Sequence, residues 1–364
     1  MWGVRNDKKI LKSTFAVLTV FLLTLTSVNA QPLENNDLKD VLLNYFSNSF
    51  NVRKTLKNTE NQYILPNSLL QQEDNLNSQF LSTYGEQLGE QISNYNLELD
   101  MDVVSKDNDS IKVNVVTKAN FNYVDSEDAS YSEENHIVHL KNYNGKMLVE
   151  KDIFDADNDL NKLDKSISSD DNYKNYMKER IKNLENKTND MNKILISEKS
   201  NSYSQNFSSN RVARSVYRNS GYDGEKGAAW AKKYANPDGE RDNKYEADCT
   251  NFASWTLFRG GMPTDKTWYH YSNAWIRVIE LRNWLINKGY ATEKDNYKYA
   301  RLGDIIQYKN KSGIWRHSVV VTSKTSSYPY VRVSAHSKNR RDVNVSGIYY
   351  PNGEFISYRV LCIK

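Results

Sequence analysis

The sequence predicts an α+β protein with two folded parts, and three patterns support that prediction. The first half combines an amphipathic helical pattern with strand patterns of alternating hydrophobicity. The second half begins with helical patterns and ends in strand patterns. Between them, residues 199–214 are rich in Ser and Asn and lack periodicity, which is typical of a flexible linker.

The N-terminus has the pattern of a secretory signal peptide over residues 1–30. Basic residues between 5 and 12 precede an apolar run at 15–28, and Val28-Asn29-Ala30 resembles a small-residue cleavage site. An uncleaved anchor is the less favoured alternative, because the run is shorter than the roughly 20 residues that a membrane span needs. We therefore expect a secreted, extracellular protein that can associate with the cell wall and has no stable membrane span after signal cleavage.

Residues 31–165 are expected to form a smaller α+β domain. Apolar residues between Leu38 and Phe46 follow helical spacing, alternating strand patterns come next, and Asn144-Gly145 joins two of them as a hairpin turn. A helix followed by an antiparallel meander is typical of cystatin-like or NTF2-like domains. The acidic stretch 155–159 resembles the start of a calcium loop, but Leu160 and Ser166 stand where Gly and Glu are required, which favours a solvated turn.

Residues 166–198 are predicted to form one long helix, because apolar residues from Tyr173 to Leu195 recur at helical spacing. That stripe can pack within the chain or against another chain; packing within the chain is favoured, and the oligomeric state stays open. A second domain then extends over 215–364. Six of the seven tryptophans lie between Trp230 and Trp315, which indicates an aromatic core with one or two rings lining a cleft.

Cys249 is the most informative residue of the second domain. Aromatic residues at 252, 255 and 258 follow it every three positions, and a Gly pair at 260–261 ends the pattern, which predicts a helix that begins near Cys249. Asp248 or Thr250 is expected to cap that helix. Free N–H groups at a helix start favour a thiolate and can stabilise an oxyanion, so the pattern points to a nucleophilic cysteine.

Two histidines downstream are candidates for the base. His317 begins a strand pattern, and His336 ends the next one. In a hairpin centred near 326–327, the two histidines fall opposite each other, with Cβ atoms about 5 Å apart. His317 then acts as the base and His336 orients it. The alternative is structural histidines, which are common beside Val-rich strands, but the ordered Cys, His and His favour catalysis.

The sequence also suggests roles for the second cysteine and for the residues of a substrate cleft, and it bears on metal binding. Cys362 lies in a terminal strand pattern and is expected to be buried and inert, although a disulfide with Cys249 stays open. No His, Cys or Asp cluster has the spacing of metal ligands, so neither a metal nor another cofactor is expected. The residues predicted to line a substrate cleft are Trp268, His270, Trp275 and Asp304.

The motif Asp-Cys-Thr-Asn-Phe at 248–252 resembles the putative amidase domain family, which is similar to the CHAP and NlpC-type cell-wall cysteine hydrolases of papain-like fold. Tyr245 before the motif, Gly303-Asp304 and the two His segments extend the resemblance over about 150 C-terminal residues. It implies that Cys249 is the nucleophile and His317 the base, with Asp248, Thr250 and Tyr245 supporting the oxyanion site. Where the family typically has Ser-Gln, this chain has Ser254-Trp255.

These observations predict a secreted cysteine amidase or peptidase that hydrolyses an amide bond through a thioester. The expected substrate is peptidoglycan or a wall-associated peptide. The formal net charge of +4 is small for 364 residues and argues against a dedicated nucleic-acid binder. The alternative is a catalytically silent extracellular domain of the same fold that only binds the cell wall.

Overall fold

The structure is a computed structural model that describes residues 35–154, 160–202, 220–235, 248–337, 339–345 and 355–364. Its main element is an antiparallel sheet. Its ten strands form one sheet in the order β1-β2-β3-β9-β8-β7-β6-β10-β5, and β4 pairs with β3. Neighbouring strands are antiparallel, and helices accompany both halves of the sheet. The predicted α+β class is therefore confirmed.

The first half of the chain contributes an antiparallel meander. Its strands are β1 (Ile92–Lys106), β2 (Ser110–Tyr123), β3 (Ala129–Tyr143) and β4 (Lys146–Ile153). Side chains along β2 alternate between buried and partly exposed positions, as expected for a strand with one face on a core. The predicted turn at Asn144-Gly145 joins β3 to β4, and both residues have the positive φ of a tight hairpin turn, 52° and 81°.

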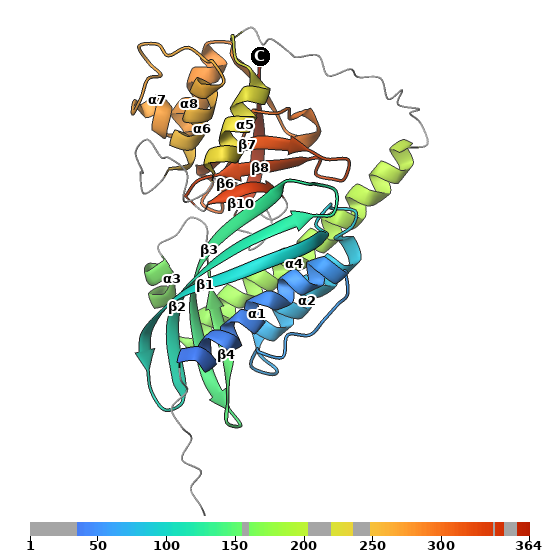
Figure 1. The fold of residues 1–364 in the computed structure, drawn as a ribbon, viewed down its shortest axis with the longest axis vertical. Helices are drawn as coiled ribbons and strands as arrows, with labels where there is room; N and C mark the ends of the chain where they lie inside the picture. Colours follow the sequence, from blue (N-terminus) through green and yellow to red (C-terminus); the bar gives the residue numbers. More distant parts are fainter. Residues whose placement is uncertain (1–34, 155–159, 203–219, 236–247, 338, 346–354) are drawn as a thin grey trace, which may run out of the picture. The chain divides into compact units, whose positions relative to one another are not determined.

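Four helices belong to this first half: α1 (Asn35–Thr55), α2 (Leu69–Tyr84), α3 (Leu160–Ser166) and α4 (Asp170–Ser202). α1 contacts β1, and α2 contacts the long helix α4 (Figure 1). The apolar stripe of α4 is buried within the chain, since Met177 is 0% exposed and Ile181 7%. α2 was not predicted, because its buried face includes polar side chains such as Glu73 and Ser78.

The second half places helices before strands, as the sequence indicated. Its helices are α5 (Gly224–Tyr234), α6 (Cys249–Arg259), α7 (Asn273–Ile276) and α8 (Val278–Asn287). The strands are β5 (Ala291–Lys294), β6 (Ile305–Asn310), β7 (Trp315–Lys324), β8 (Val331–Ala335), β9 (Arg340–Asn344) and β10 (Phe355–Ile363), with a 3-10 turn η1 at Tyr297–Tyr299.

Two hydrophobic clusters cover the two faces of the C-terminal strands. Val320 packs in a cluster with aromatic residues of α6 and α7, which we call the helix-side cluster. Its neighbours Val319 and Val321 pack in the other cluster, with apolar residues of β1 and β2, which we call the strand-side cluster. Successive side chains of β7 therefore point to opposite faces of the sheet, one towards the helix-side cluster and the next towards the strand-side cluster.

The two halves meet in one sheet through β3 and β9. Tyr131 pairs with Arg341 and Ser132 with Arg340, and residues Glu34–Lys364 form one compact unit. The linker was predicted over residues 199–214. Residues 199–202 belong to α4 instead, and residues 203–214 lie outside the described residues. The predicted signal peptide at 1–30 and the acidic turn at 155–159 also lie outside them.

Gly303, just before β6, anchors the packing of α5 against the sheet. Its φ is +77°, and a Cβ there would lie 2.4 Å from Tyr222 Oη and 2.5 Å from Gly224 O. Tyr222 Oη donates a hydrogen bond to Gly303 O at 2.8 Å, so the tyrosine cannot move away without losing that bond. Only glycine combines this backbone angle with this close approach.

We predict that Gly303→Ala lowers the free energy of unfolding by more than about 2 kcal/mol, through left-handed strain and overlap with Tyr222. Gly313→Ala is the matched control, because Gly313 has φ +76° but nothing within 4 Å of its added Cβ. It should cost only about 1 kcal/mol. Denaturant unfolding of the two variants measures the difference, and equal losses would contradict the packing role of Gly303.

Candidate active site

Cys249 is the first residue of α6, as the sequence predicted, and its side chain is buried. The cap of this helix differs from the expectation. Asp248 makes no side-chain capping bond, and Ser337 Oγ instead accepts hydrogen bonds from the backbone N–H groups of Asp248 and Cys249, at 3.0 and 3.1 Å. The hydroxyl of Ser337 therefore occupies donors that were expected to face an oxyanion.

The cysteine sulfur lies between its own helix and strand β7. Cys249 Sγ is 3.8 Å from the carbonyl oxygen of Arg316 and 3.8 Å from Thr250 Oγ1. Thr250 does not cap the helix, because its hydroxyl is hydrogen-bonded to Ser318 Oγ at 3.1 Å. Ser318 Oγ in turn accepts from Gln307 Nε2 at 3.3 Å. This chain of polar contacts ties the start of α6 to β7 and β6.

Asp248 holds two other side chains of the site. Its Oδ2 lies 2.6 Å from His336 Nδ1, and its Oδ1 accepts a hydrogen bond from Asn251 Nδ2 at 2.6 Å. The side chain of Asn251 also accepts from Trp275 Nε1 at 2.7 Å. All four residues are buried. The acidic residue of the motif is thus the centre of a buried polar network rather than a helix cap.

His336 is fixed on both ring nitrogens and on one ring face. Besides the contact to Asp248, its Nε2 lies 2.8 Å from the carbonyl oxygen of Tyr234 at the end of α5. Its ring stacks on Phe252, with centroids 4.1 Å apart. Both nitrogens therefore lie within hydrogen-bond distance of an oxygen. This geometry suits a residue that positions the start of α6, and it does not orient His317 as predicted.

His317 lies on the opposite face of the sheet from His336. Val320 pairs with Ser334, and continuing that register places His336 opposite Ser318 instead of His317. The ring of His317 lies 6.3 Å from that of Tyr308 and 5.9 Å from that of Phe355, both in the strand-side cluster. The expected cross-strand His pair is therefore not formed. A shift of one residue in strand register moves each side chain to the opposite face of the sheet. The bulge of β7 beside Val321 produces such a shift between β7 and β8.

The residues predicted to line a substrate cleft are mostly internal. Trp268 and Trp275 are 0% exposed and stack at 4.6 Å in the helix-side cluster. Asp304 is also 0% exposed and accepts hydrogen bonds from the backbone N–H groups of Arg301 and Ile363, so it stabilises the turn before β6. His270 is half-buried against Trp255 and Trp275, with ring centroids 4.5 and 4.6 Å away.

The remaining predictions concern Tyr245 and the second cysteine. Tyr245 lies outside the described residues. Cys249 and Cys362 are both free thiols and both buried, so they form no disulfide. The sequence did not indicate the contact of Ser337 with the start of α6, although Ser337 directly follows His336. Ser337 has φ +80°, a backbone angle that its residue type does not reveal.

The described residues contain neither a membrane-spanning helix nor a metal-binding cluster. None of the described helices combines the length and apolar character that crossing a membrane requires. Within the same residues, no three His, Cys, Asp or Glu side chains lie close enough together to hold a metal ion.

We predict that Asn251→Ala destabilises the fold by about 2–3 kcal/mol, because it leaves the buried indole N–H of Trp275 and one oxygen of Asp248 without their partner. Asn108→Ala in the exposed β1–β2 turn is the control, with an expected change within about 0.5 kcal/mol. Thermal unfolding of both variants tests this network, and an Asn251 variant as stable as the control would contradict it.

Two comparisons with known proteins find a match for part of this chain. Residues 221–360 match the model of a family described as "Putative amidase domain". The uncharacterized protein YjcM of Bacillus subtilis (strain 168) is 34% identical over 155 residues, which are 38% of this chain and 37% of that protein. The chain thus spans little more than a third of this relative. No solved structure matches the chain. The C-terminal half, which contains Cys249, His317 and His336, is therefore similar to a family of amidase domains.

Proposed function

We propose that the C-terminal half of this protein is a cysteine-dependent amidase with Cys249 as its nucleophile. The observation that carries the proposal is the placement of a free thiol at the first residue of α6, inside the segment that matches the amidase family. A helix start favours the thiolate form of a cysteine. The other residues of the motif then serve to hold that helix start in place.

The proposed reaction proceeds in two steps. The thiolate of Cys249 attacks the amide carbonyl carbon, and protonated His317 gives its proton to the nitrogen as the C–N bond breaks, which releases an amine and leaves a thioester. Neutral His317 then takes a proton from water while the water oxygen attacks the thioester carbon, so that the C–S bond breaks, the carboxylic acid leaves, and the Cys249 thiolate and protonated His317 are restored. The reaction needs no oxidant, metal or cofactor.

His317 is assigned as the base because His336 has both ring nitrogens beside other oxygens. This assignment requires the imidazole of His317 to turn from the strand-side cluster to the face of Cys249. The extra residue Arg316 gives β7 a bulge at this point, where His317 pairs with Tyr308 and Trp315 with Lys309. Because moving a bulge exchanges the faces of the residues beside it, the assignment requires this bulge to move when substrate binds.

We further propose that the enzyme is secreted and acts on an amide bond of peptidoglycan or of a wall-associated peptide, in a papain-like fold of the NlpC and CHAP type. The signal-peptide pattern at 1–30 and the resemblance of the Asp-Cys-Thr-Asn-Phe motif to cell-wall cysteine hydrolases support this substrate class. The order of nucleophile helix and antiparallel strands, α6 before β6, β7 and β8, supports the fold.

A second candidate function is a cell-wall binding module without turnover. The placement of the His317 ring against Tyr308 and Phe355 favours it, because a base must reach the thiol to act. The two functions differ in one respect that an assay can measure: the module retains wall fragments, whereas the amidase releases new amino and carboxyl groups from them.

We predict that the wild-type chain releases soluble fragments with new amino termini from purified Gram-positive cell walls. Cys249→Ala should lower that rate by about 10³-fold or more, and His317→Ala by about 10²-fold or more. Cys362→Ala is the matched control, because it removes the other buried thiol, and it should keep the wild-type rate.

Three results would count against this assignment. Equal release by wild type and Cys249→Ala would exclude the thiol as nucleophile. Full activity in His317→Ala, with loss only in a stably folded His336→Ala, would transfer the base to His336. Wall binding without any release by the wild-type chain would favour the binding module.

A further prediction concerns the reactivity of the two thiols. At pH 6, iodoacetamide should alkylate Cys249 at least about 10-fold faster than Cys362, because a helix start favours the thiolate and an apolar strand does not. Peptide mapping by mass spectrometry after timed quenching measures both rates in one sample. Equally slow modification of the two cysteines would contradict an activated nucleophile.

A further inference from the structure

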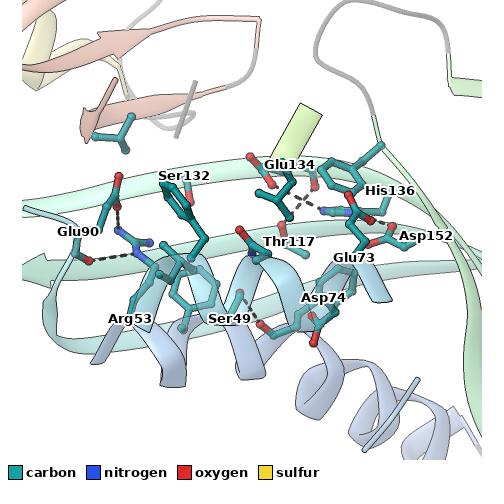
Figure 2. Close-up of a pocket in the computed structure, with 18 of the residues that line it drawn as sticks. Ser49, Arg53, Glu73, Asp74, Glu90, Thr117, Ser132, Glu134, His136 and Asp152 are labelled. Atoms are coloured by element: carbon teal, nitrogen blue, oxygen red, sulfur yellow. Dashed lines mark hydrogen bonds and ion pairs between the residues drawn. The ribbon is translucent and has the colours of Figure 1, made fainter. Parts of the chain in front are cut away.

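A cavity lies far along the sequence from Cys249, between the helices of the first half and the sheet. Its volume is about 290 Å³, and it is lined by side chains of α1, α2, α4 and strands β2, β3 and β9 (Figure 2). This volume is near the lower end of the range for sites that bind small molecules. The proposed amidase chemistry uses none of these residues.

Most charged groups in the cavity wall are already paired. Glu73 Oε1 accepts a hydrogen bond from Arg180 Nε at 2.7 Å. Arg53 and Glu90 form an ion pair at 3.1 Å, and Figure 2 shows this pair at one end of the cavity, away from His136. Arg340 donates to Glu134 at 2.6 Å. Because these groups bind one another, they have little hydrogen-bonding capacity left for a ligand.

Two buried polar atoms in the same wall have no hydrogen-bond partner. One is Nε2 of His136, whose side chain is only 5% exposed, and the other is Oδ2 of Asp74. Nδ1 of His136 lies 2.9 Å from Asp152, and Nε2 lies 4.0 Å from Oε2 of Glu134, which is beyond hydrogen-bond distance (Figure 2). In the tautomer that carries its proton on Nδ1, Nε2 is a hydrogen-bond acceptor, as is a carboxylate oxygen of Asp74. A buried polar atom without a partner costs free energy, so both atoms favour a ligand that donates hydrogen bonds.

The charge balance of the wall points in the same direction. Among the described lining residues there are five carboxyl groups, against four Arg or Lys side chains and one imidazole. Burial lowers the pKa of Lys187 to about 8. Burial, and then repulsion from Glu73 and Asp152, raise the pKa of Asp74 to about 7. A positively charged ligand near Asp74 would relieve that repulsion.

Aromatic rings pack against His136 on two sides. The ring of Phe46 lies 4.7 Å from that of His136, and the ring of Phe154 lies 5.1 Å from it on another side. Both phenylalanines line the cavity. Aromatic faces attract cations and also give apolar contact to a carbon body. The wall therefore combines acceptors for an ammonium group with apolar surface for the remainder of a ligand.

We propose that this cavity is a binding site for a small organic cation, a primary ammonium on an apolar body, whose N–H groups donate to Asp74 and His136. The site would bind independently of Cys249, so it adds a ligand-binding function to the half of the protein that carries no proposed chemistry.

Titration of the full chain with 2-phenylethylammonium chloride, followed by calorimetry and NMR, tests this site. The uncharged analogue 2-phenylethanol has the same body without the cation and should bind at least about 10-fold more weakly. Asp74→Asn should lower the affinity for the ammonium at least 10-fold and leave that for the alcohol unchanged. Asp102→Asn, at an exposed carboxylate of β1, is the matched control and should bind like wild type.

An NMR measurement on the wild-type protein tests the proposal even if Asp74→Asn does not fold. The imidazole 15N resonance of His136 Nε2 should shift on titration with the ammonium, whereas those of the other four histidines should not. Equal affinities for the ammonium and the alcohol, no binding of the ammonium, or an unmoved His136 resonance would each overturn the proposal. Loss of amidase activity in Cys249→Ala would leave this result unaffected.

Discussion

The pairing of Asp248 with His336 is the interaction on which the rest of the C-terminal site depends. It joins the residue before α6 to the residue after β8, 88 positions later, and places Ser337 against the N–H groups of the helix start. Asn251 and Trp275 extend the pairing into the aromatic core. Because each buried polar atom of this network needs its partner, the position of Cys249 is determined by packing far from the sulfur itself.

This network gives four of the five motif residues a structural role. Asp248, Thr250 and Asn251 each make a buried side-chain hydrogen bond, and Phe252 stacks on His336. Cys249 is the member whose thiol lies at the junction of helix and strand. The motif therefore combines the thiol of Cys249 with four residues whose contacts hold the helix start in place, which is consistent with the proposed nucleophile on a rigid scaffold.

Periodicity predicted much of this fold, and its failures have physical causes. The α1 stripe, the Asn144-Gly145 turn, the long helix α4 and the start of α6 follow from local patterns. α2 was missed because its buried Glu73 is paired with Arg180, a partner 107 residues away. The pairing of His317 with His336 was wrong, because strand register depends on a bulge and a turn whose geometry residue types do not reveal. The tryptophans expected in a cleft lie in the core, since burial depends on tertiary packing.

We propose that Cys249 forms a thioester with the acyl part of an amide substrate. The decisive measurement is the intact mass of the chain, acid-quenched within a single turnover on soluble peptidoglycan fragments. We expect an added acyl mass that maps to the peptide containing Cys249, disappears with time in wild type and never forms in Cys249→Ala. Fragment cleavage without any such adduct, or an adduct that maps to another residue, would contradict it.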